Sequence, residues 1–397
     1  MDLISKTWLT VTVVTSIALI TLRVLDCIET TSIWRRDSYF RHTGFILLLG
    51  VSIFTFKADS VPSISWLSSI TFLYIGLVQL SVLWSDDHRL CIKFSIQHTI
   101  IALTAFTITT QLSTPQCALL FITVCSTHLI IALWEDLSTG AIKRNGYRFS
   151  GRGLPFVQAL SAILIAYCIT YLKQLGYVHN STFVVVTIIA ILLFLATRTI
   201  SALIAAAFSL TVWFSLSHWD WPQSGFYLVL FWVLVFAVGI FLYQKKSTRS
   251  LLYIALSLGR KPASHSNANL LSGRNIIWRY AFRGIIKRPL LGYGYGVFWA
   301  PRRVKEFSVH MSVQRSGCTA HSIYLDSVLN TGLIGLVVYV ALLTIAFANG
   351  VVAPVPERQL FAALIAFVAI GGISDSYFII PGYEAFCLYL ILFSLAR

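Results

Sequence analysis

Arg198 is the first residue of this 397-residue sequence whose type and position suggest chemistry. It is the only Asp, Glu, Lys or Arg between Lys173 and Asp220, and the run from Ser181 to Leu216 around it is otherwise uncharged. A charge at the centre of a bilayer costs about 2.5–3.5 kcal/mol on insertion scales, so an arginine in such a run is a candidate functional residue. The alternative is an arginine at the tip of a helical hairpin that only reaches the membrane interface.

A basic amphipathic helix is predicted for residues 274–287, with Ser272 as a possible N-cap and Pro289 as a stop signal. One face carries basic residues that we expect to lie against anionic headgroups: Arg279, Arg283 and Lys287. The opposite face is apolar and consists of Ile277, Trp278, Ala281 and Ile285. Arg274 falls with the apolar face, where its guanidinium must find an anion or carbonyl groups once the helix packs. Arg274 is therefore a second candidate for a binding role, although a structural role stays open.

His321 lies in the stretch Thr-Ala-His-Ser-Ile-Tyr-Leu-Asp, which opens another predicted apolar span. A histidine at a membrane interface can titrate near neutral pH and act as a general base. On a helix, Asp326 would lie about 140° from His321, so it could not orient the imidazole from the same face. A lone histidine is often a hydrogen-bonded structural residue instead, and both interpretations stay open.

Two pairs of acids follow the ends of apolar spans, Asp86-Asp87 and Glu135-Asp136. Each pair could chelate a divalent ion, but solvation of a helix end is the role that we favour. The seven cysteines form no CxxC pair, and the histidines do not cluster. The sequence therefore predicts neither a disulfide framework nor a metal site, and the cysteines are expected to be small core residues.

The elements that position these residues are predicted membrane-spanning helices. Hydrophobic residues make up 57% of the sequence and charged residues 11%, with a mean hydropathy of +0.78, which excludes a soluble globular protein. Apolar runs of about 20 residues can cross a bilayer as helices. They predict spans at 8–25, 43–57, 62–84, 94–112, 116–134, 155–173, 182–197, 199–216, 224–243, 320–348, 357–380 and 383–396. The first span lacks a signal-peptide cleavage site and is expected to be retained. The predicted fold is an all-α polytopic membrane protein with about 12 transmembrane helices.

One long hydrophilic segment, Gln244–Thr319, separates the ninth and tenth predicted spans. It carries 14 Lys and Arg but a single acid, Glu306, and contributes much of the formal net charge of +15. The positive electrostatic field of such a segment near a membrane attracts lipid phosphates, pyrophosphates or acidic glycans. Nucleic acid is a poor partner, because the aromatic residues are not interleaved as a stacking platform. We therefore divide the chain into transmembrane helices 1–9 (residues 1–243), a basic loop with the amphipathic helix (244–319) and transmembrane helices 10–12 (320–397).

A glycine-rich stretch, Gly292-Tyr-Gly-Tyr-Gly296, lies within this loop. It has neither the preceding strand nor the following Gly-Lys-Ser/Thr that a nucleotide-binding loop needs. We interpret it as a flexible turn that allows close approach of the backbone.

Several stretches of the sequence resemble the O-antigen ligase and polymerase superfamily. They are Ser-Gly-Arg274-Asn-Ile-Ile-Trp278, Arg-Pro-Leu-Leu-Gly-Tyr-Gly-Tyr-Gly-Val-Phe-Trp299, Ala-His321-Ser-Ile-Tyr324-Leu and Asn-Thr-Gly-Leu-Ile-Gly-Leu336. The second stretch looks similar to the exopolysaccharide-polymerase branch. Weaker upstream patterns also fit, namely Trp84-Ser85-Asp86-Asp87 and Thr197-Arg198-Thr199. The layout of twelve helices with one long loop before the tenth resembles the family layout as well.

The resemblance implies an inverting membrane glycosyltransferase that polymerises or transfers polyprenyl-pyrophosphate-linked oligosaccharides in exopolysaccharide or O-antigen biosynthesis. By position, Arg198 and Arg274 would bind the donor pyrophosphate, and His321 would be the catalytic base. The residues with an implied supporting role are Trp278, Tyr324, Asp86 and Asp87. Paired guanidinium groups can neutralise a leaving pyrophosphate, so neither a metal nor another cofactor is implied.

The same resemblance implies a place in the cell and a set of partners. The protein would lie in the bacterial inner membrane, with its active site and the long loop on the periplasmic face. Its partners would be the lipid-linked glycan donor, a glycan or lipid acceptor, and membrane lipids. The positive-inside rule conflicts with this orientation, because most of the 30 Lys and Arg would then be periplasmic. We follow the family layout, since anion-binding arginines on the catalytic side raise the count there.

Three alternatives stay open. A ligase, which moves a finished glycan to a lipid or protein acceptor, needs the same donor chemistry as a polymerase. A metal-dependent glycosyltransferase would need Asp86 or Asp87 as a ligand. A transporter of lipid-linked glycans belongs to a different class, but the two halves show no visible repeat and the charges gather in one loop.

Overall fold

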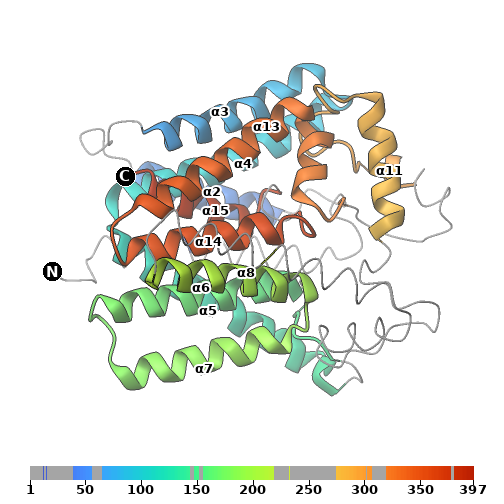
Figure 1. The fold of residues 1–397 in the computed structure, drawn as a ribbon. Helices are drawn as coiled ribbons and strands as arrows, with labels where there is room; N and C mark the ends of the chain where they lie inside the picture. The colour runs from blue at the N-terminus through green and yellow to red at the C-terminus, as the bar shows by residue number, and fades with distance from the viewer. Residues whose placement is uncertain are drawn as a thin grey trace. The chain divides into compact units, whose positions relative to one another are not determined.

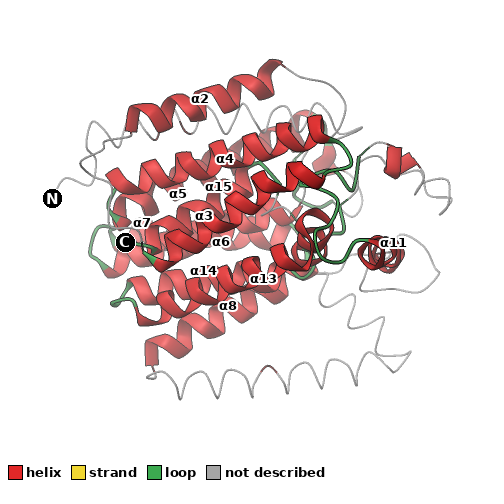
Figure 2. Cartoon of the chain, turned by 90° about the horizontal axis from the view of Figure 1, so that it is seen from above, coloured by secondary structure: helices red, strands yellow, loops and turns green. Residues whose placement is uncertain are grey.

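A computed structural model of the protein describes Thr12, Thr15, Trp232 and residues 39–55, 65–143, 147–151, 155–218, 274–300, 302–305, 319–376 and 380–397. Figure 1 traces the helices along the chain, and Figure 2 shows that every regular element of this described part is helical. The predicted all-α membrane fold is confirmed. The elements are α2 (Tyr39–Thr55), α3 (Trp66–Leu80), the 3₁₀ turn η2 (Ser81–Trp84), α4 (His88–Gln111), α5 (Thr114–Ser138), the 3₁₀ turn η3 (Ala141–Lys143), α6 (Pro155–Gln174), α7 (Asn180–Ala196), α8 (Ile200–His218), α11 (Arg274–Lys287), α13 (Ile323–Val352), α14 (Glu357–Gly371) and α15 (Tyr383–Leu395).

The described helices include six segments that are long and apolar enough to cross a membrane: α3 with η2, α4, α5, α6, α8 and α13. Helices α7 and α15 are shorter and also apolar. The predicted spans 8–25 and 224–243 fall outside the described residues, apart from Thr12, Thr15 and Trp232. The count of twelve spans therefore stays a prediction.

The spans predicted at 357–380 and 320–348 differ from the helices observed. The span predicted at 357–380 contains α14, but this helix ends at Gly371, where Gly371 and Gly372 weaken helix propagation. The span predicted at 320–348 corresponds to α13, which begins only at Ile323, so His321 precedes the helix instead of opening it. The separation of about 140° expected between His321 and Asp326 on a helix therefore does not apply. A break at Gly332 also interrupts α13.

The chain forms two compact units, which are described separately. The first contains residues 1–128, 276–349 and 372–397, and the second contains residues 129–275 and 350–371. In the first unit, α4 packs against α2, α3 and α15. In the second unit, α8 packs against α14, and α6 packs against α7.

Two helices of the second unit, α6 and α7, differ in how far their side chains are buried. Helix α6 buries almost every side chain from Phe156 to Leu172 and lies in the core of this unit. Helix α7 instead exposes large apolar side chains such as Val185 (55%), Ile188 (52%) and Leu192 (61%). Exposure of that size on an apolar helix is typical of a surface that faces lipid.

A buried polar cluster ties the glycine-rich stretch to the core of the first unit. The Nδ1 atom of His98, on α4, lies 2.7 Å from the hydroxyl of Tyr295. Its Nε2 atom lies 2.5 Å from the hydroxyl of Tyr389, on α15. All three side chains are buried, and their mutual hydrogen bonds avoid the cost of isolated polar groups in an apolar core.

Candidate active site

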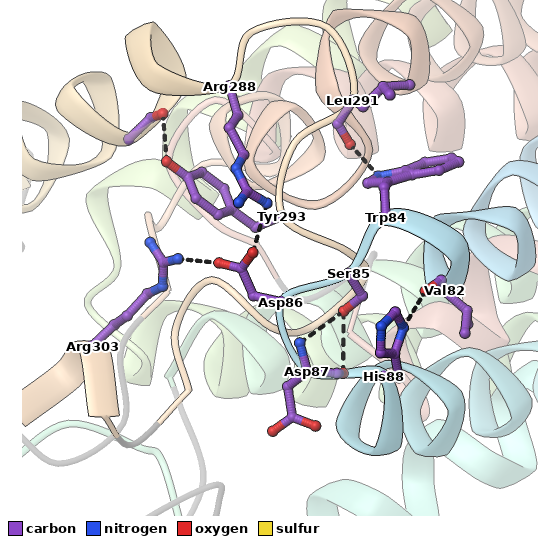
Figure 3. A network of polar contacts seen from close by, with 11 residues as sticks. Val82, Trp84, Ser85, Asp86, Asp87, His88, Arg288, Leu291, Tyr293 and Arg303 are labelled. Atoms are coloured by element: carbon purple, nitrogen blue, oxygen red, sulfur yellow. Dashed lines mark hydrogen bonds and ion pairs between the residues drawn. The ribbon is translucent and has the colours of Figure 1, made fainter.

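Asp86, in the turn between η2 and α4, binds the segment that follows α11 (Figure 3). Its Oδ1 atom pairs with Arg288 Nη1 at 2.6 Å, and its Oδ2 atom pairs with Arg303. The guanidinium of Arg303 also lies over the ring of Tyr293, 4.3 Å from the centroid. These charged side chains are partly exposed, at 29% for Asp86, 46% for Arg288 and 27% for Arg303, so water weakens each ion pair. The contacts fasten the segment to the turn.

Asp87, the next residue, caps the N-terminus of α4. Its carboxylate accepts a hydrogen bond from Leu90 N at 3.0 Å, so Asp87 caps the following helix, whereas the sequence favoured solvation of the end of the preceding span. The ion pairs of Asp86 with two distant arginines were not predicted. In the part of the chain that the structure describes, His, Cys, Asp and Glu side chains form no group of three that could hold a metal ion.

The glycine-rich stretch approaches its neighbours more closely than a side chain would allow. Gly292, Gly294 and Gly296 have φ angles of 67°, 93° and 74°, in the left-handed region. A Cβ atom on Gly294 would lie 2.4 Å from Ser85 Oγ, and one on Gly292 would lie 2.7 Å from Leu329 O. The predicted close approach of the backbone is therefore present, at sites where only glycine fits.

This stretch and Pro289, which precedes it, provide hydrogen bonds to backbone groups of α13 that the break leaves without helical partners. Gly332 has φ 73° and ψ −171°, and a Cβ atom there would lie 1.9 Å from Leu290 O. Tyr293 N donates to Leu329 O at 2.8 Å, and Leu333 N donates to Pro289 O at 2.8 Å. Non-helical backbone inside an apolar span is tolerated where protein groups satisfy it, as here.

His321 lies in a short loop before α13 whose backbone is held on both sides. Ala320 O accepts a hydrogen bond from the indole of Trp278, at 2.8 Å. Ser322 N donates to the hydroxyl of Ser376 at 2.8 Å. His321 itself is half-buried, and its φ of 48° lies in the left-handed region, which is uncommon for residues other than glycine. Such backbone persists only where its surroundings determine it, and it concentrates at functional sites.

Asp326 is the residue whose role the sequence analysis missed. It does not need to share a helical face with His321, because its carboxylate accepts from Ala320 N at 3.0 and 3.1 Å. The indole N–H of Trp299 donates to Asp326 Oδ1 at 2.7 Å. Asp326 is 4% exposed, so the carboxylate depends on these donors. An acid in the first turn of a helix is the sequence signal that could have indicated this role.

Helix α11 carries Trp278 into this arrangement. Ile277 and Ala281, on the predicted packing face, are buried in one cluster with Phe298, Trp299, Val304, Ala320 and Leu329. The predicted basic residues lie exposed on the helix: Arg279, Arg283 and Lys287. The amphipathic helix is thus present with the predicted faces, and Trp278 binds the loop that holds His321. Tyr324, half-buried in the first turn of α13, has its ring 6.4 Å from that of Tyr339.

Arg198 lies in the second unit, at the corner between α7 and α8. Helix α7 ends at Ala196 and α8 begins at Ile200, so Arg198 lies in a short connection between two helices, as predicted, but α7 packs against α6 and does not form a packed hairpin with α8. Arg198 is half-buried, its N–H donates to Leu195 O at 3.1 Å, and its φ is 48°. Arg274, the first residue of α11, is also half-buried and belongs to the same unit.

A loop at residues 147–151 contacts the corner that holds Arg198, and the sequence analysis assigned it no role. Asp136, near the end of α5, is 2% exposed and accepts from Ser150 N at 3.2 Å and Gly151 N at 3.0 Å. It also accepts from the hydroxyl of Tyr147 at 2.8 Å. Burial, together with the hydrogen bond to Asp136, raises the pKa of Tyr147 above its usual value. Tyr147 therefore stays a neutral donor at physiological pH.

Comparisons with known proteins bear on the same residues. Residues 183–340 match the family model described as O-antigen ligase. An exopolysaccharide production protein, ExoQ of Rhizobium meliloti (strain 1021), is 32% identical over 83 residues, which cover 19% of this chain and 18% of that protein. The match thus spans less than a fifth of the curated relative. The region matched by the family model contains Arg198, Arg274, Trp278, His321 and Tyr324.

Proposed function

We propose that this chain, whose residues 183–340 match the O-antigen ligase family model, is a membrane glycosyltransferase of the O-antigen ligase and polymerase superfamily that polymerises polyprenyl-pyrophosphate-linked repeat units. The observation that carries the proposal is the family match, because it includes both arginines and the histidine that suggested chemistry on their own. The left-handed backbone of Arg198 and His321 supports their choice as candidate functional residues. The similarity to an exopolysaccharide production protein favours exopolysaccharide as the product class.

The proposed reaction is a single displacement at the anomeric carbon of the donor sugar. The acceptor hydroxyl oxygen forms a bond to this carbon while the bond from carbon to pyrophosphate oxygen breaks, which inverts the configuration. His321 accepts the hydroxyl proton as a general base. Arg198 and Arg274 bind the pyrophosphate and stabilise the negative charge that develops on it as it leaves.

No metal ion is required in this proposal. The ion pairs of Asp86 and the capping role of Asp87 support it, because both carboxylates already have protein partners. Purified enzyme is expected to remain active in excess EDTA. Loss of turnover in EDTA and its recovery with Mg²⁺ or Mn²⁺ would favour the metal-dependent alternative.

We propose that the reaction takes place on the periplasmic face of the bacterial inner membrane. Cys318, in the basic loop, can report this orientation. The described cysteines are all buried, namely Cys91, Cys117, Cys125, Cys168 and Cys387. With the other cysteines replaced, a membrane-impermeant thiol reagent should label Cys318 in intact spheroplasts. Labelling of a folded protein only after lysis would reverse the orientation and move the reaction to the cytoplasm.

The family description favours one second candidate, a ligase that transfers a finished glycan to a lipid or protein acceptor. Deletion of the gene separates the two. A polymerase mutant should lose long surface chains and accumulate donor that carries a single repeat unit. A ligase mutant should accumulate long polymer that is still linked to the polyprenyl donor, and that result would contradict our proposal.

A further inference from the structure

The corner between α7 and α8 holds Arg198 in a conformation that the rest of the corner must impose. Three residues, Thr197, Arg198 and Thr199, make the whole connection between the two helices. Thr197 is 1% exposed, and its hydroxyl donates to Phe194 O at 2.7 Å. The left-handed backbone of Arg198 is unfavourable for a residue with a Cβ atom, so contacts on either side must hold it.

Arg148 supplies those contacts from outside the connection between α7 and α8. Its Nε atom donates to Thr197 O at 3.1 Å, and its Nη2 atom donates to Thr199 Oγ1 at 3.1 Å. One planar guanidinium thus binds the residues immediately before and after Arg198. The next residue, Phe149, donates its N–H to Ala196 O at 2.9 Å, so the backbone of the 147–151 loop also contacts the corner.

The loop that carries Arg148 is itself anchored in the second unit. Asp136 receives three hydrogen bonds from this loop, one from a phenol and two from backbone N–H groups. Gln158, on α6, donates to Ser150 O at 3.0 Å. A continuous set of hydrogen bonds therefore runs from α5 and α6 through Arg148 to both neighbours of Arg198.

We propose that Arg148 is a positioning residue for Arg198, an inference that rests on the pyrophosphate-binding role proposed above for Arg198. Arg148 holds the corner so that the Arg198 guanidinium already points toward the anion before the donor binds. A pre-organised group binds more tightly because less freedom is lost on binding. A lysine at 148 keeps the charge but cannot form the planar fork that reaches both threonines.

A double-mutant cycle on the purified full-length protein tests this inference. We would measure the dissociation constant for undecaprenyl pyrophosphate, together with the KM and kcat for the lipid-linked donor. Arg148→Lys and, separately, Thr199→Val should weaken binding by about tenfold to a hundredfold, since misplacement of a binding group by about 1 Å can cost that much. In an Arg198→Ala background, Arg148→Lys should change binding no further.

The control is Lys143→Gln, at an exposed position of the same unit, which should leave binding unchanged. Thermal unfolding checks that each variant is folded, and Thr199→Val carries the test if Arg148→Lys does not fold. Additive effects of the Arg148 and Arg198 substitutions would overturn the positioning role of Arg148 but leave the pyrophosphate-binding role of Arg198 in place. Normal binding by Arg198→Ala would instead refute the pyrophosphate role of Arg198, and the positioning role with it.

Discussion

Arg198 and His321 share a φ angle of 48°, and among the described residues other than glycine they alone have a positive φ. The two residues lie in different structural settings: Arg198 connects two helices, and His321 precedes one. Left-handed backbone costs of order 1–3 kcal/mol at such residues and is retained where the surrounding contacts impose it. Two of the three residues that the sequence analysis singled out, Arg198 and His321 but not Arg274, are thus also the two with unusual backbone, which is an independent reason to test them.

His321→Ala should lose about 10²–10⁴-fold in kcat without loss of folded protein, because general-base assistance typically contributes that much. A neutral imidazole is needed to accept a proton, so activity of the unmodified protein should fall as the pH drops through the titration of histidine. Steady-state kinetics from pH 5 to about pH 8 would measure both effects. Full activity of a folded His321→Ala protein would show that another group is the base.

Arg198→Lys and Arg274→Lys should each lower kcat/KM by about 10²–10³-fold, nearly as much as the alanine variants. An ammonium group cannot reproduce the paired donors that a pyrophosphate receives from guanidinium. Matched controls come from the exposed basic face of α11, where Arg279→Lys, Arg283→Lys and Lys287→Gln should change activity little. Polymer length on gels and donor turnover would measure the difference. Normal polymer length in both arginine variants would demote these residues to structural roles.

Trp299→Phe should destabilise the fold by about 1–3 kcal/mol, because it leaves the buried carboxylate of Asp326 without its indole donor. Activity should fall as well, since Asp326 binds the residue next to His321. Trp84→Phe is the control: its indole donates to Leu291 O in an exposed position, where water can replace it. Thermal unfolding in detergent should therefore show a larger decrease for Trp299→Phe. Equal decreases would argue against a special role for the Trp299–Asp326 bond.

Gly332→Ala should be among the most disruptive glycine substitutions, with a lower yield of folded protein. Its Cβ atom would collide with the Leu290 carbonyl, and alanine also disfavours a φ of 73°. Gly76→Ala, within α3, is the matched control, because nothing lies within 4 Å of its added Cβ atom. Fluorescence size-exclusion of both variants would test the difference. A Gly332→Ala protein with unchanged yield and unfolding temperature would mean that the break can straighten.

The sequence predicted features that depend on local pattern. The length of the apolar runs located α4 to α8, and the amphipathic pattern of α11 assigned its packing face to Ile277 and Ala281. Other features depend on partners far along the chain. Nothing near Arg148 indicates that it binds residues some 50 positions later. The two arginine partners of Asp86 lie still further along the chain, more than 200 residues away. The break at Gly332 escaped prediction because residues 327–356 contain no Asp, Glu, Lys or Arg, so the region was interpreted as one continuous span.

The break in α13 also sets how deep its two parts can lie. The 20 residues from Leu333 to Val352 measure about 30 Å at 1.5 Å per residue, which matches the thickness of the hydrocarbon core. The shorter part, from Ile323 to Thr331, is then not needed to cross the core and can stand in the headgroup layer. The pyrophosphate of a lipid whose polyprenyl tail lies in the core is at that same depth. In the reaction proposed above, His321, just before the shorter part, would meet the pyrophosphate at that depth without the lipid leaving the bilayer.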